Sequence, residues 1–349
     1  MDHGPRRERY LFSFGLITDI QYADICDRQN SSNAKWRRYR NSLFCLQEAV
    51  TYWKAEKSSP AFIVQLGDII DGFNASLVDA NGDERNFSKE ALVAVMKEFS
   101  KLPHEMPVFH NLGNHELYNF SRKELTKSVL HPFNSCPSAA YLSSHRSHPV
   151  ISKGETKPFY FSFSPHPKFC FVYLDSYDIS ILGEEESSPR YKRGIKMIRR
   201  HNKNEDQASL DGLNGLERRF VESNGAIGTA QLSWLNNVLH HAQGNGQKVV
   251  IFSHVPIHPG NRKPLDLLWN YEDVLKVLWQ FRCVVACLHG HTHEADYYLD
   301  KNGIHHLAFD AVVEAPLQSN AFATLHVKND SITIEGFGVI KSQVLTFPQ

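Results

Sequence analysis

The sequence has no net charge, no long apolar run and no regular spacing of cysteines. Lys and Arg together number 38, as do Asp and Glu, so the formal net charge at pH 7 is zero. Such a balance lacks the broad positive field of a protein whose main partner is nucleic acid or a membrane surface. No apolar run approaches the roughly 18 residues that a membrane-spanning helix needs. We therefore expect neither a nucleic-acid partner nor a membrane partner.

The six cysteines are widely separated, and residues 1–9 are polar, without the apolar segment that directs secretion. We expect residues 1–9 to be a disordered tail and the thiols to be free in a cytoplasmic protein. A length of 349 residues with 42% hydrophobic and 22% charged residues is typical of a large globular protein. We expect one domain over residues 10–349, present as a monomer.

Short apolar runs alternate with helix-like segments along the chain. Helices with one apolar face are predicted at about 37–56, after Ser88, after Thr229 and at 271–280, with Ser88 and Thr229 as the capping residues. Ser121 and Glu124 have the spacing of a capping box. The last 45 or so residues contain three strand-like runs, which we expect to pair antiparallel, at 322–327, 332–337 and 343–347.

The composition changes between residues 131 and 228 to Pro, Ser, Gly and charged residues, with strand-like runs only at 159–163 and 169–174. We interpret 131–228 as an insertion, or cap, on one face of the core. Its length and composition differ from those of the alternating strands and helices on either side.

Five apolar runs end in side chains that can bind metal ions, and ligand sites gather at the carboxyl ends of strands in α/β sheets. Taken singly these endings are weak signals, because a Gly-Asp after a strand is usually a turn and an isolated His is usually a core residue. Five in one chain favour a common site. The endings are Asp19-Ile20-Gln21, Gly67-Asp68-Ile69-Ile70-Asp71, Gly113-Asn114-His115-Glu116, Ser253-His254 and Gly290-His291-Thr292-His293.

The order of these motifs resembles the calcineurin-like metallophosphoesterase superfamily. The superfamily usually has His at the third position of the first motif, whereas this chain has Gln21. With GDIIDG, GNHELYN, the WNY at 269–271 and GHTH, this departure resembles a narrower family, the manganese-dependent ADP-ribose/CDP-alcohol diphosphatases. The resemblance implies an α/β fold in which a two-sheet sandwich is flanked by helices, in four layers αββα, with an inserted cap.

The same resemblance implies a site for two divalent cations with Asp68 as the bridge. Oxygen-rich donors that include neutral amides suit Mn²⁺, with Mg²⁺ as the alternative. His115 is implied to be catalytic, facing the leaving group, and we expect it to act mainly as a charge stabiliser when a phosphate leaves. The implied ligands are Asp19, Gln21, Asp68 and His293 for the first metal, and Asp68, Asn114, His254 and His291 for the second.

The implied reaction is hydrolysis of the diphosphate bond in nucleoside diphosphate conjugates by a hydroxide that the two metals activate. ADP-ribose would give AMP and ribose 5-phosphate, and CDP-choline or CDP-glycerol would give CMP and a phospho-alcohol. One alternative is a phosphodiesterase of the same fold acting on cyclic nucleotides or other phosphodiesters, whose members usually keep His at position 21. A second is a non-catalytic scaffold, which would have lost ligands. Little aromatic surface follows Gln21 beyond Tyr22, so base preference stays open.

Overall fold

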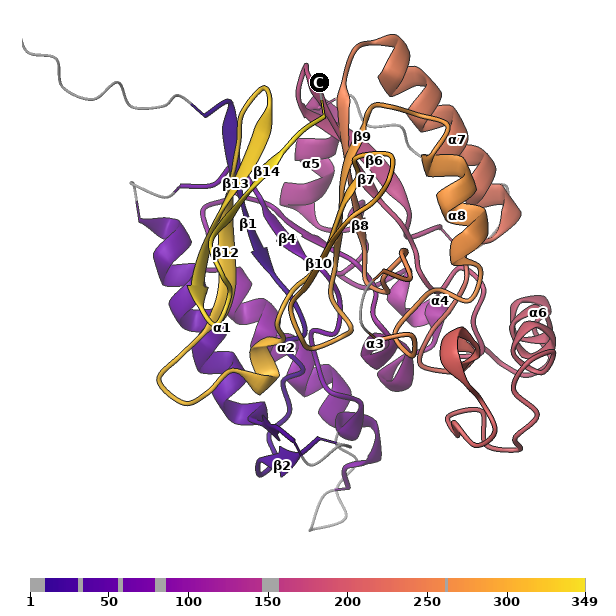
Figure 1. Cartoon of the computed structure of the whole chain (residues 1–349). Coiled ribbons are helices and arrows are strands. Elements are labelled where there is room, and N and C mark those ends of the chain that lie inside the picture. The colour runs from indigo at the N-terminus through magenta and orange to yellow at the C-terminus, as the bar shows by residue number, and fades with distance from the viewer. Residues whose placement is uncertain are drawn as a thin grey trace, which may run out of the picture.

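The computed structural model describes residues 10–30, 34–55, 59–78, 86–145, 157–260 and 263–348. Two six-stranded sheets pack face to face, and helices cover both outer sides (Figure 1). The predicted four-layer arrangement of helices and sheets is confirmed. In the described part of the chain, no helix is long and apolar enough to cross a membrane.

The first sheet has the strand order β14-β13-β12-β1-β4-β5. Three of its strands are parallel to one another, and the C-terminal strands add to β1 in an antiparallel run, as predicted. The strands are β1 (Phe12–Ile17), β4 (Ile63–Gln65), β5 (Val108–His110), β12 (Ala321–Val327), β13 (Ser331–Gly338) and β14 (Gln343–Thr346).

The second sheet has the order β10-β11-β9-β8-β7-β6, with β7, β8, β9 and β11 parallel. The sequence pattern did not predict β10 or β11. The strands are β6 (Phe161–His166), β7 (Phe169–Tyr173), β8 (Lys248–Ser253), β9 (Val284–His289), β10 (Asp296–Leu299) and β11 (His305–Ala308).

The segment 131–228 is more than a cap on one face, because β6 and β7 are strands of the second sheet. Their aromatic side chains are buried and pack across the sandwich against the first sheet. The rings of Phe163 and Phe62 lie 5.4 Å apart, and those of Phe171 and Phe14 lie 5.2 Å apart. These contacts belong to the main core, so this part of the segment cannot be removed without opening the sandwich.

Helices α1 (Tyr39–Lys54) and α2 (Phe87–Phe99) lie on the side of the first sheet, and α7 (Thr229–Gly244) and α8 (Tyr271–Leu278) on the side of the second (Figure 1). In α1, Leu46, Val50 and Trp53 recur at helical spacing and are buried against the core.

Two of the predicted helix-capping residues were wrong, because each helix begins at a different residue from the one expected. Asn86 caps α2 by accepting from Lys89 N, whereas Ser88 lies inside the helix. Gly228, not Thr229, precedes α7. The Ser121 and Glu124 capping box is confirmed at α4 (Arg122–Leu125).

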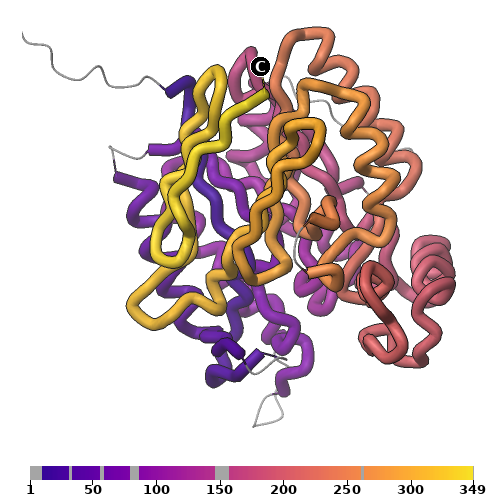
Figure 2. The backbone as a smooth tube through the Cα atoms, viewed as in Figure 1, coloured from indigo at the N-terminus to yellow at the C-terminus, as the bar shows by residue number. Residues whose placement is uncertain are grey.

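The remaining short elements lie mostly around the carboxyl ends of the parallel strands. Figure 2 shows segments of the N-terminal half, in purple, and of the C-terminal half, in orange, coming together there. These elements are β2 (Arg28–Gln29), β3 (Trp36–Arg37), η1 (Gly72–Ser76), α3 (Asn114–Asn119), α5 (Cys136–Ser144), α6 (Pro189–Ile198), η2 (Gly215–Arg219) and η3 (Val312–Glu314).

Candidate metal centre

The seven predicted metal ligands lie at one end of the sandwich, and the two sheets supply different donor atoms. The strands β1, β4 and β5 of the first sheet lead to the four residues with carboxylate or amide groups. The strands β8 and β9 of the second sheet lead to the three histidines. The centre therefore lies where the carboxyl ends of strands from the two sheets come together.

Asp68 is common to two groups of potential metal ligands. One group is Asp68, His254 and His291, and the other is Asp19, Asp68 and His293; within each, the donor atoms all lie within 4.8 Å of one another. A carboxylate shared in this way has the position that a bridging ligand between two cations requires.

The two amide residues complete these groups. Asn114 Oδ1 lies 3.3 Å from His254 Nε2, beside the first group. Gln21 Nε2 lies 2.8 Å from His293 Nε2 and 3.1 Å from Asp68 Oδ2, beside the second. The structure thus brings all seven predicted residues together.

Two buried oxygens at the centre lack hydrogen-bond partners in the described residues. Asp19 Oδ1 and Gln21 Oε1 are both inaccessible to solvent and accept no hydrogen bond there. Burying such atoms without a partner is costly, and a divalent cation that prefers oxygen donors would offset the cost. The donor set therefore fits the implied cations.

Each of the three histidines uses one ring nitrogen in a hydrogen bond to a residue outside the predicted ligand set, which leaves the other nitrogen available for a cation. Oriented imidazoles of this kind are characteristic of metal sites. The acceptors are Leu66 O for His254 Nδ1 at 2.8 Å, Asn224 Oδ1 for His291 Nε2 at 2.8 Å, and Glu314 Oε1 for His293 Nδ1 at 2.9 Å. Asn224 and Glu314 were not predicted from the sequence, because neither lies in a motif.

The backbone at the centre is held in a conformation that L-residues seldom adopt. Of the six non-glycine residues with positive φ in the described chain, five are predicted ligands. Left-handed residues other than glycine cost on the order of 1 kcal/mol each and gather at functional sites. The five are Asp19 (50°), Gln21 (43°), Asp68 (58°), His291 (68°) and His293 (59°).

Glycines before the ligands allow the loops to approach one another closely. A Cβ atom on Gly113 would overlap the Asp68 carboxylate, and one on Gly67 would overlap the His254 ring. Gly67 also has φ of +111°, which favours glycine. Gly67 and Gly113 are thus packing requirements of the centre.

Glu116 joins two of the ligand loops, a role that sequence reasoning missed. Its carboxylate accepts from the backbone N–H groups of Asp68 (2.9 Å), Ile69 (2.6 Å) and Gly113 (2.7 Å). Burial and the nearby Asp68 charge raise the pKa of Glu116 to about 7. The carboxylate fixes the strand ends that present Asp68 and Asn114.

His115 is oriented toward the centre. Its Nδ1 accepts from Gly72 N at 2.7 Å, so the neutral ring carries its hydrogen on Nε2, which lies 3.9 Å from Asp68 Oδ2. Asp71 Oδ2 lies 3.4 Å from His115 Nδ1. Asp71 also forms a turn, since its Oδ1 accepts from Phe73 N at 2.9 Å.

The charges at the centre are strongly coupled. Although burial opposes ionisation, His254 and His115 hold the pKa of Asp68 far below its usual range. Burial favours the neutral ring in His254, but the Asp68 carboxylate outweighs it and raises the pKa of His254 to about 9. Without cations the imidazole is protonated at neutral pH, so cation binding at His254 must displace a proton.

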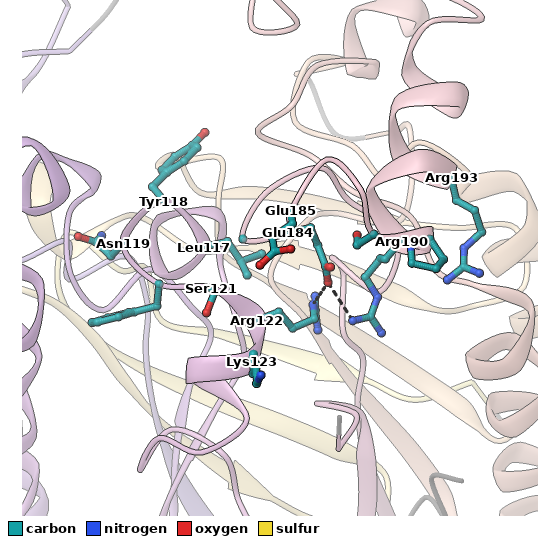
Figure 3. A pocket seen from close by; sticks show the side chains of 14 residues that line it. Leu117, Tyr118, Asn119, Ser121, Arg122, Lys123, Glu184, Glu185, Arg190 and Arg193 are labelled. Atoms are coloured by element: carbon teal, nitrogen blue, oxygen red, sulfur yellow. Dashed lines mark hydrogen bonds and ion pairs between the residues drawn. The ribbon is translucent and has the colours of Figure 1, made fainter. Parts of the chain in front are cut away.

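An open cavity of about 660 Å³ lies beside His291 and His293. A separate cavity of about 730 Å³ lies at the far end of α3, where Arg122 and Arg190 both approach Glu184 (Figure 3). These ion pairs attach the segment before α6 to the region that follows α3.

Comparison with known proteins identifies the family. Residues 12–295 match the model of the calcineurin-like phosphoesterases. The chain is 40% identical to a manganese-dependent ADP-ribose/CDP-alcohol diphosphatase of Bos taurus, covering 99% of both chains. It is 41% identical to the Homo sapiens protein of the same name, covering 97% of this chain and 93% of the other. The chain belongs to this family of diphosphatases.

A solved structure supports the assignment. The crystal structure of a dimetal phosphatase from Danio rerio is 36% identical in sequence and matches with a TM-score of 0.84, covering 97% of this chain and 100% of the other. The diphosphatase family and the four-layer fold thus agree with the expectations from the five strand-end motifs.

Proposed function

We propose that this chain is a manganese-dependent hydrolase that cleaves the diphosphate bond of ADP-ribose and CDP-alcohols. The observation that carries the proposal is the Asp68 carboxylate shared between two histidine-containing groups with oriented imidazoles. The family relatives named for this activity support the substrate class and the metal.

Our assignment places two cations on the residues named from the sequence. Asp19, Gln21, Asp68 and His293 would hold the first, and Asp68, Asn114, His254 and His291 the second. When bound, the cations would supply a nucleophilic water and neutralise the diphosphate oxygens. The carboxylate and amide oxygens with the three imidazoles favour Mn²⁺ over a metal that needs thiolates.

The chain's own residues would orient the substrate and stabilise charge. His115 presents Nε2–H toward the centre and can donate to an oxygen of the leaving phosphate. A departing phosphomonoester has a second pKa of about 6 and needs little protonation. His115 would therefore act mainly by stabilising charge.

We further propose a cytoplasmic monomer without nucleic-acid or membrane partners. All six cysteines are free, which suits a reducing compartment. The zero net charge supports the proposed absence of a polyanionic partner. Sedimentation equilibrium would test whether the chain is a monomer. Fractionation of cells that express the chain would test whether it is cytoplasmic.

Hydrolysis of a substrate panel tests the proposed activity. ADP-ribose, CDP-choline, cyclic AMP and bis(p-nitrophenyl) phosphate are each assayed with Mn²⁺ and with Mg²⁺. We expect the diphosphates with Mn²⁺ to give the highest kcat/KM, with a nucleoside monophosphate as a product. Lack of turnover of either diphosphate would contradict the proposal, and preference for cyclic AMP would favour the phosphodiesterase alternative.

A further inference from the structure

Among the residues that the structure describes, the cavity of about 660 Å³ beside the metal centre is lined by cationic and acidic side chains and by no Phe, Tyr or Trp side chain. A nucleobase is usually held by stacking on an aromatic ring, which this lining does not offer. The half of a substrate that suits this cavity is the polar half that lacks the base. Arg37, Arg218 and Lys263 supply its positive charges.

Most charges in this cavity are already neutralised by neighbours. Glu294 lies 3.1 Å from Lys263 and 3.4 Å from Lys35. Glu314 lies 3.5 Å from Arg37 and also accepts from His293. These pairs leave little net charge around Arg37 and Lys263.

Arg218 differs from these cations, because it has no hydrogen-bond or ion-pair partner among the residues that the structure describes. It is half-buried in η2 and its side chain lines the cavity that contains His291 and His293. A guanidinium is always charged near neutral pH and is suited to phosphate and hydroxyl oxygens. The third acidic residue of the lining, Asp266, lies 4.0 Å from His291 Nε2. Arg218 therefore contributes positive charge next to the metal centre that no described carboxylate pairs with.

The neighbouring residue holds Arg218 in place. Arg219 is buried; its Nε donates to Trp269 O at 3.0 Å, and its guanidinium lies 4.3 Å from the centre of the Phe220 ring. Asn224 connects the same segment to the centre, donating to Arg219 O and accepting from His291. The backbone at Arg218 is thus anchored on both the core and the metal centre.

We propose that Arg218 makes this cavity a subsite for the non-nucleoside half of the substrate and selects against a cationic alcohol. The subsite accepts neutral polyol or anionic groups attached through phosphate and disfavours a quaternary ammonium. This inference rests on the proposed function and adds a substrate preference, with CDP-glycerol and ADP-ribose used better than CDP-choline.

The matched pair CDP-glycerol and CDP-choline tests the proposal, because the two share the base and the diphosphate and differ in distal charge. We expect wild type to favour CDP-glycerol in kcat/KM by roughly fivefold, the effect of about 1 kcal/mol between partly screened charges. The preference should fall to about one in Arg218→Gln, persist in Arg218→Lys and reverse in Arg218→Glu. Added salt should weaken it in wild type.

Arg200→Gln is the control, since it removes the same charge from an exposed position in the same segment. Calorimetry with glycerol 3-phosphate and phosphocholine in the presence of Mn²⁺ gives a second measurement that needs no turnover. Tighter binding of glycerol 3-phosphate, lost in Arg218→Gln but kept in Arg200→Gln, supports the subsite. Equal preference in wild type and Arg218→Gln by both measurements overturns it. Failure of the proposed function would instead appear as no turnover of either CDP-alcohol by wild type.

Discussion

The metal centre can be compared with a second histidine cluster, formed by His258, His289 and His306 on and beside the second sheet. The rings of His258 and His306 lie 4.7 Å apart, and those of His289 and His306 lie 6.3 Å apart. Asp300 Oδ2 is 3.4 Å from His306 Nε2. In the described part of the chain, this cluster does not form a group of three close ligand atoms, as the metal centre does.

The two differ in their carboxylates, because Asp68 is shared by two groups of ligand atoms at the metal centre, whereas Asp300 lies beside His306 in the second cluster. At the metal centre, Asp68 outweighs burial and raises the pKa of His254 to about 9. In the second cluster, burial and then His306 lower the pKa of His258 to about 4. Neutral packed rings stabilise a core. His254 faces Asp68 and would exchange its proton for a cation, whereas burial lowers the pKa of His291 to about 3, so His291 would bind a cation without losing a proton. The count of 19 histidines therefore says little about metal binding.

Replacing the shared carboxylate should have the largest effect. In Asp68→Asn we expect diphosphatase activity to fall by about 1,000-fold or more and Mn²⁺ binding to weaken, because charge is lost from both ligand groups. Activity assays and Mn²⁺ titration measure these losses. Asp300→Asn removes the carboxylate of the second histidine cluster and should keep both properties. If Asp300→Asn also lost Mn²⁺, the proposed distinction would fail.

His115 tests whether a histidine at the centre can act without being a ligand. His115→Ala should slow hydrolysis of a phosphodiester with a basic alkoxide leaving group by about 100-fold or more, and of ADP-ribose by much less. Mn²⁺ affinity should change little, in contrast to His254→Ala. Equal losses on both substrates would contradict the charge-stabilising role.

Replacing Glu314 tests whether its hydrogen bond to His293 strengthens metal binding. Glu314→Gln keeps an oxygen near His293 Nδ1 but removes the charge, so we expect Mn²⁺ affinity to fall by about 10-fold, at the low end of such effects. Calorimetric titration measures the change. Glu294→Gln, on an exposed residue nearby, is the control, and equal affinities for the two variants would rule out this role for Glu314.

The second histidine cluster should instead influence stability in acid. Burial lowers the pKa of His306 below 6.5 even though Asp300 opposes the shift. Below pH 6.5 the unfolded chain therefore binds a proton that the folded chain does not, and the free energy of unfolding decreases as pH falls. His306→Leu should reduce this slope by up to about 1.4 kcal/mol per pH unit. Urea unfolding between pH 5 and pH 7 measures it, and an unchanged slope would contradict the assignment.

The sequence predicted the centre better than its surroundings. Asp68, Asn114 and His254 could be found because each follows an apolar run directly, and strand ends converge in this class of fold. Asn224 and Glu314 could not, since each lies far from any motif and reaches a histidine only through tertiary packing.

The fold, too, has parts that local sequence patterns predicted and parts that they did not. The apolar run of β1 and the apolar face of α1 were evident from local spacing. By contrast, β10 is short and its side chains are largely exposed, so it has no apolar pattern to recognise. The role of β6 and β7 in the second sheet depends on aromatic contacts with Phe14 and Phe62, which are distant in sequence.

The division of donors, oxygen from one sheet and nitrogen from the other, has a mechanical consequence. A cation held by Asp19 and His293, or by Asp68 and His254, would act as a clamp that ties the two halves of the sandwich together at one end. Chelation would release that clamp, and the strands that end there would open more often. Protection of amide hydrogens should then fall at the carboxyl ends of both β1 and β9, although the two strands belong to different sheets.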